Sequence, residues 1–137
     1  MRIPPLCLVL CIIALAPRLA WADGQGVPRD GKHLDAPALL AILDRAEKAS
    51  MWFEDGYEGG LRYRFSSDGA MTVRSRYVRN QVISGTWRVQ EETGALCTRI
   101  EEDPEHCSGV YALEDGRIFV HVAHLSRKAN TFEMVPE

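Results

Sequence analysis

The chain lacks most of the patterns that mark an enzyme or a nucleic-acid-binding protein. Its 137 residues contain no G-x-S-x-G motif, no H-E-x-x-H motif and no glycine loop that would cradle a phosphate. Asp and Glu together outnumber Lys and Arg by 19 to 16, a balance that does not favour general affinity for nucleic acid or anionic lipid. We therefore expect no catalytic residues, no cofactor, no metal and no nucleic acid partner.

Long hydrophobic runs are also missing, apart from one near the N-terminus. Residues 6–16 read LCLVLCIIALA, which suits the core of a signal peptide and is too short to span a bilayer. Ala20 and Ala22 place small residues at the −3 and −1 positions of a cleavage site. We predict a signal peptide at residues 1–22, a periplasmic or secreted protein, and no membrane span after cleavage. The alternative is a cytosolic protein with an apolar N-terminal segment.

Cysteine is scarce once the signal peptide is removed. Cys7 and Cys11 lie inside it, which leaves only Cys97 and Cys107. Two cysteines in an oxidising compartment predict one disulfide. A thiol or metal pair is the alternative, although the spacing is wider than that of a C-x-x-C redox site. Removal of Arg2 and Arg18 with the signal peptide would change the net charge from −3 to −5.

Beyond the signal peptide, the pattern predicts a flexible arm followed by one domain at residues 35–137. Residues 23–34 are glycine-rich and polar, as in a mobile arm. Asp35 is a good N-cap for a short amphipathic helix that follows it. The apolar stripe of this helix comprises Leu39, Leu40, Ile42, Leu43 and Ala46.

From residue 61 the hydrophobic period changes to two, which is typical of strands. A bulged turn with Gly69 in the left-handed conformation would pair Phe65 with Met71 and Tyr63 with Val73. Further strands are expected at residues 82–89, 95–100, 107–113, 117–123 and 131–135. The predicted fold class is mainly β with one N-terminal helix, an antiparallel meander of six or seven strands curled into a small barrel or half-barrel.

Arginines on the predicted outer face of the sheet form the first candidate site. The register expected from the turns places Arg62 opposite Arg74 and Arg64 opposite Thr72, with Arg76 opposite Ser84 and Arg88 opposite Thr72. Like charges that face each other are mildly destabilising, which favours a bound anionic partner. Such a partner would be an anionic envelope component or an acidic protein surface. The alternative is a solvated face whose arginine stems cover apolar surface. The candidate residues are Arg62, Arg64, Arg74, Arg76 and Arg88.

The second candidate site is the segment at residues 51–60, MWFEDGYEGG, which we expect to be a glycine-rich linker. Its aromatic residues, Trp52, Phe53 and Tyr57, are placed to line the mouth of a carrier of a small apolar ligand beneath the helix. The alternative is that they plug the end of the barrel.

The histidines do not form a convincing metal site. His121 and His124 would point to opposite faces of a strand, which is poor geometry for joint metal binding.

Three motifs together resemble a class of small exported bacterial β-rich domains of unknown function. They are an F-x-x-D-G turn at residues 65–69, a G-x-W-x-V strand at residues 85–89 and an L-C…C hairpin that starts at Leu96. More loosely, the G-x-W triplet is similar to a lipocalin motif. The resemblance implies a β-rich fold with a disulfide and no known catalytic residues. We expect a non-enzymatic exported binding or envelope-associated module, with the arginine face as its contact surface or, alternatively, a lipocalin-like carrier.

Overall fold

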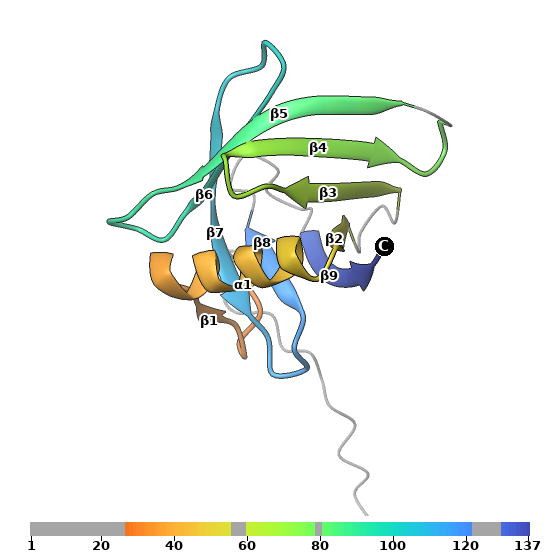
Figure 1. Cartoon of the computed structure of the whole chain (residues 1–137). Coiled ribbons are helices and arrows are strands. Elements are labelled where there is room, and N and C mark those ends of the chain that lie inside the picture. The colour runs from red at the N-terminus through yellow and green to blue at the C-terminus, as the bar shows by residue number, and fades with distance from the viewer. Residues whose placement is uncertain (1–26, 56–59, 79–80, 122–129) are drawn as a thin grey trace, which may run out of the picture.

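In the part of the chain that the structure describes, eight antiparallel strands close into a barrel, and one helix lies against it (Figure 1). The computed structural model describes residues 27–55, 60–78, 81–121 and 130–137. The predicted signal peptide with its cleavage site, Tyr57 and His124 lie outside these residues. The prediction of a mainly β fold with one N-terminal helix and a small antiparallel barrel is confirmed.

The barrel is closed because β7 pairs with β8 as well as with β6. Its strands follow the order β7-β6-β5-β4-β3-β2-β9-β8, and the short β1 pairs with β7 outside the ring. The described part of the chain thus has nine strands rather than the expected six or seven. Their bounds are β1 (Lys32–His33), β2 (Met51–Asp55), β3 (Leu61–Phe65), β4 (Ala70–Ser75), β5 (Val82–Val89), β6 (Leu96–Ile100), β7 (His106–Ala112), β8 (Ile118–His121) and β9 (Asn130–Pro136).

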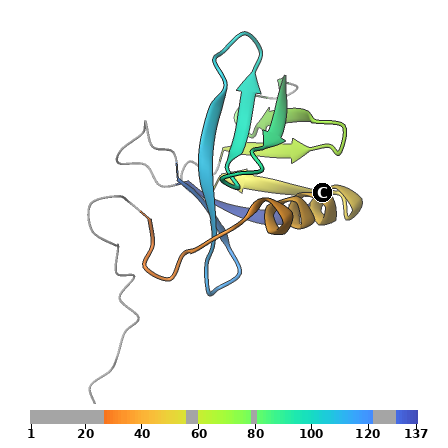
Figure 2. The ribbon, with the colours of Figure 1, turned by 90° about the vertical axis from the view of Figure 1, so that its left-hand side faces the viewer.

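Helix α1 (Ala36–Lys48) begins where the sequence predicts. The Asp35 side chain accepts a hydrogen bond from the backbone N–H of Ala38 at 3.0 Å, which satisfies one free donor of the first turn. Leu39 and Leu43 are buried toward the barrel interior, whereas Leu40 on the neighbouring face is exposed. Figure 1 shows α1 below β3 and β4, and Figure 2 shows the helix against the barrel from the side.

The predicted hairpin of β3 and β4 has the expected register. Arg62 lies opposite Arg74 and Tyr63 opposite Val73, and Gly69 has a φ of +84° in the turn. Between β4 and β5 the register differs from the prediction, because Ser84 pairs with Thr72 rather than with Arg76. The chain turns directly after β4, where the Ser75 hydroxyl accepts a hydrogen bond from the N–H of Tyr77. The shift is an even number of residues, so every side chain keeps its predicted face.

The end of the predicted flexible arm is ordered against the barrel. Lys32 and His33 pair with Ala112 and Tyr111 of β7, and the N–H of Leu34 donates to a β7 carbonyl at 2.8 Å. Leu34 is itself only 8% exposed. The segment is polar apart from Leu34, and its overall composition therefore did not indicate that this side chain joins the core.

The predicted linker at residues 51–60 is wrong for its first half, because Met51–Asp55 form β2. This strand pairs with β3 on one side and with β9 on the other. Trp52 and Phe53 are both buried although they point to opposite faces. A strand buried on both faces shows no alternation of apolar and polar residues, which is why the period-two pattern missed it.

Candidate functional site

An apolar cavity of about 310 Å³ lies inside the barrel next to α1 and opens to the surface. This volume lies at the lower end of the range of about 300–1,000 Å³ that is usual for sites of small molecules. The cavity extends from the helix to the strands β6 and β7. Its lining residues are Leu39, Leu43, Phe53, Tyr63, Phe65, Leu96, Thr98, Ile100, His106, Ser108, Val110, Ile118, Val120 and Phe132.

Strand alternation creates the cavity, because every second side chain of each strand points inward. On β6 and β7, Thr98 pairs with His106 and Leu96 pairs with Ser108, all at inward positions. Thr98 and Ser108 are small and therefore leave space between the larger apolar side chains around them. His106 is exposed, so this polar part of the wall reaches the molecular surface.

Polar side chains are few in this wall and lie close together on two neighbouring strands. Thr98 and Ser108 offer hydroxyl groups and His106 offers an imidazole, each able to donate or accept a hydrogen bond. Most of the remaining wall is aliphatic or aromatic. The arrangement fits a small, mainly apolar molecule that carries one polar group.

The sheet divides the aromatic residues that were predicted to form one ligand mouth. Phe53 points inward and lines the cavity. Trp52 points outward, is 2% exposed and lies beneath the guanidinium groups of Arg64 and Arg74. Tyr57 lies outside the described residues. Of Trp52 and Phe53, the structure therefore brings only Phe53 to the cavity.

The guanidinium groups of the predicted arginine face mostly contact partners in the same chain. Arg62 and Arg76 both pair with Glu54, the former with its Nη2 3.7 Å from the carboxylate Oε2. Arg64 Nη1 lies 3.0 Å from Oε1 of Glu137. These contacts explain how the outer face tolerates several arginines on adjacent strands.

Trp52 explains why Arg74 is tolerated directly opposite Arg62. The guanidinium carbon of Arg74 lies 5.0 Å from the centre of the Trp52 ring, and that of Arg64 lies 5.6 Å from it. A cation over an aromatic face is attracted by the ring quadrupole. Arg74 has no ion pair among the described residues and is exposed. It is the member of the arginine face most open to an external partner.

Arg88 has a separate role beside the disulfide. It shares the predicted outer face, but it does not lie opposite Thr72, which pairs with Ser84. On its other side, Arg88 lies opposite Cys97 of β6. Its Nη2 and Nε donate to the two carboxylate oxygens of Glu105 at 2.7 and 3.0 Å. The hydrogen bonds from Arg88 lower the pKa of the Glu105 carboxyl. This bidentate pair ties β5 to the start of β7.

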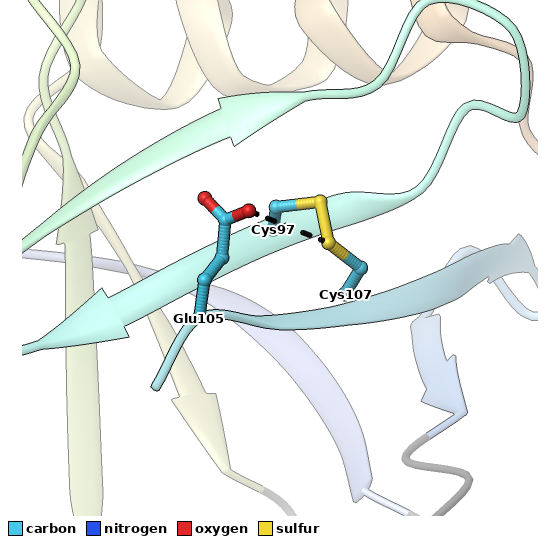
Figure 3. A group of neighbouring side chains, drawn as sticks. All are labelled: Cys97, Glu105 and Cys107. Carbon is cyan, nitrogen blue, oxygen red and sulfur yellow. Dashed lines mark hydrogen bonds between the residues drawn. A yellow bond between two sulfur atoms is a disulfide. The ribbon is translucent and has the colours of Figure 1, made fainter. Parts of the chain in front are cut away.

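The predicted disulfide between Cys97 and Cys107 is present, on directly opposite residues of β6 and β7 (Figure 3). A Glu105 carboxylate oxygen lies 4.0 Å from the Cys107 sulfur. The three side chains are close enough together to suggest a metal site. Because the sulfurs are bonded to each other, they are not thiolates and do not offer metal ligands in this state. The disulfide links the two strands of the β6–β7 hairpin covalently.

Comparison of the chain with protein-family models, curated proteins and solved structures gave no match. The resemblance to a class of small exported bacterial domains, and its lipocalin-like aspect, thus stay predictions. Within the described residues, no helix has both the length and the apolar character needed to cross a bilayer.

The polar residues of the cavity wall were not predicted from the sequence to line a binding site. Thr98, His106 and Ser108 each fall at an inward position of a predicted strand or directly beside one. Small or polar residues at such positions were the available signal, since an ordinary core would place large apolar side chains there. Recognising it requires the knowledge that β6 and β7 lie side by side in this register.

Proposed function

We propose that the protein is a non-enzymatic carrier that binds a small, mainly apolar molecule inside the barrel. The cavity of about 310 Å³ between α1 and the inner faces of the strands is the observation that carries this proposal. Apolar cavities of this size that open to the surface are the usual sites of small molecules, so this cavity favours an occupant.

The polar part of the wall supports a ligand with one hydrogen-bonding end. Thr98, His106 and Ser108 come from two strands that the Cys97–Cys107 disulfide holds together. A disulfide also suits a periplasmic or secreted protein, in agreement with the N-terminal sequence pattern. The proposed carrier therefore works outside the cytoplasm.

The experiment compares two threonine substitutions on neighbouring strands. Thr98→Phe places a ring in the cavity, whereas Thr86→Phe places the same ring on the exposed outer face of β5. Binding of the uncharged fluorescent probe phenylnaphthylamine should become about tenfold weaker or more in the first variant and stay unchanged in the second. Equal binding in both variants would show that the probe binds elsewhere.

A second substitution covers the case in which Thr98→Phe does not fold. Ser108→Leu adds less volume to the same wall and pairs with Leu96 across the hairpin. It should weaken probe binding while near-ultraviolet circular dichroism stays like that of the wild-type protein. A folded Ser108→Leu protein with full probe affinity would contradict the proposal.

A further inference from the structure

Three of the four large exposed apolar side chains of the described residues lie on one hairpin. Tyr77 is 81% exposed, Val78 50% and Val82 49%, and all three belong to the connection between β4 and β5 or to the adjoining start of β5. The remaining large exposed apolar residue is Leu40, on α1. An exposed apolar cluster of this kind calls for an explanation by contact with a partner or a lipid surface.

Two arginines lie beside this cluster, although the whole chain is acidic. Val82 pairs directly with Arg74, and Arg76 precedes Tyr77 in the chain. The outer face next to the hairpin carries four guanidinium groups, and the acids paired with them are Glu54 and Glu137. Glu133 lies opposite Glu54 on the same face, so these three acids offset most of the charge of the four arginines, and Arg74 is the one of the four without an ion pair among the described residues.

Arg74 is the side chain best placed to contact an external phosphate. It is exposed, it has no ion pair among the described residues, and its position is fixed by the ring of Trp52 beneath it. Guanidinium groups bind phosphate with directed hydrogen bonds. Tyrosine and valine on the adjacent hairpin suit the boundary between lipid headgroups and acyl chains.

We propose that this hairpin docks the protein on an anionic phospholipid surface. Tyr77, Val78 and Val82 enter the headgroup region, and Arg74 and Arg76 contact lipid phosphates. An unpaired guanidinium beside exposed tyrosine and valine side chains fits the headgroup region of an anionic lipid layer. The proposal does not depend on the ligand of the cavity, because none of these five residues lines it.

The test is sedimentation of the full chain with vesicles. The protein should sediment with vesicles that contain equal amounts of phosphatidylglycerol and phosphatidylcholine, and not with phosphatidylcholine alone. The bound fraction should fall on going from about 50 to about 500 mM salt, because salt screens contacts between exposed charges. Equal binding to both kinds of vesicle, or binding that salt does not alter, would overturn the proposal.

Matched substitutions separate this hairpin from the rest of the surface. Tyr77→Ser combined with Val82→Ser, and separately Arg74→Ser, should each reduce vesicle binding at least about fivefold. Leu40→Ser and Arg99→Ser remove exposed side chains of the same kinds elsewhere and should have no effect. All four variants should keep their affinity for phenylnaphthylamine, which distinguishes loss of docking from loss of the cavity. If the controls weaken vesicle binding as much, or if the hairpin instead mediates self-association without vesicles, the proposal is wrong.

Discussion

Trp52 and Phe53 are adjacent in the chain and have different tasks in the structure. Trp52 supports Arg64 and Arg74 from below on the outer face, and Phe53 lines the cavity on the inner face. Both side chains are less than 5% exposed, so each contributes to the stability of the barrel. Only Phe53 is in a position to contact a molecule inside the barrel.

This division predicts different outcomes for two similar substitutions. Trp52→Leu and Phe53→Leu should each lower the free energy of unfolding, by about 1–3 kcal/mol, because each leaves a buried aromatic site partly filled. Phe53→Leu should also change the affinity for phenylnaphthylamine, whereas Trp52→Leu should not. Urea unfolding and probe titration measure the two effects. Loss of probe affinity in Trp52→Leu alone would contradict the assignment of faces.

The ion pair of Arg88 and Glu105 makes the stability of the folded protein depend on pH. Arg88 lowers the pKa of Glu105 in the folded protein. The stabilisation is therefore present above the ordinary pKa of a glutamate and is lost as the pH falls through the lowered value. Both side chains are at the surface, so the effect is modest and weakens with salt.

A pH series of urea unfolding tests this pair. The wild-type protein should be more stable than Arg88→Gln at pH 6, and the difference should shrink as the pH is lowered through and below about 4. Arg45→Gln, which removes an exposed arginine from α1, serves as the control and should show no such convergence. A difference between wild type and Arg88→Gln that is the same at pH 6 and pH 3 would show that Arg88 stabilises by packing instead.

At the level of elements, the sequence predicts those parts whose signals are local. Asp35 marks the start of α1, and Gly69 marks the turn between β3 and β4, because each signal involves residues only a few positions apart. The bounds of β5 match the predicted residues 82–89 as well. These elements fix the faces of the central strands, which is why the arginines share an outer surface as expected.

The elements that the sequence did not predict depend on distant partners. β2 is a strand because β3 and β9 lie on either side of it, and β9 comes from the far end of the chain. β1 has only two residues and gains its pairing from β7. Neither contact leaves a periodic pattern in the segment itself, so propensity and alternation do not identify it.

For the whole molecule, closure of the barrel decides what the protein can bind. The pairing of β7 with β8 joins the two ends of the sheet, and α1 packs against the resulting interior through Leu39 and Leu43. The alternating pattern predicts a curled sheet but not whether its edges meet or how much space stays unfilled. The cavity is therefore a property of the assembled barrel, although its wall consists of inward positions that parity identifies.

The inner and outer faces of the barrel strands have different proposed roles. The inner face offers an apolar cavity with a small polar region, and the outer face offers arginines beside an exposed apolar hairpin. Occupancy of the inner cavity is the central claim, since the proposed function rests on it.

Native mass spectrometry of protein isolated from the cells that produce it tests this claim most directly. The wild-type protein should retain a small molecule whose mass is released on unfolding, and Thr98→Phe, isolated in the same way, should be free of it. Thr86→Phe should retain the molecule as the wild type does. A wild-type protein that carries nothing, or a Thr98→Phe protein that carries the same molecule in the same amount, would contradict the account.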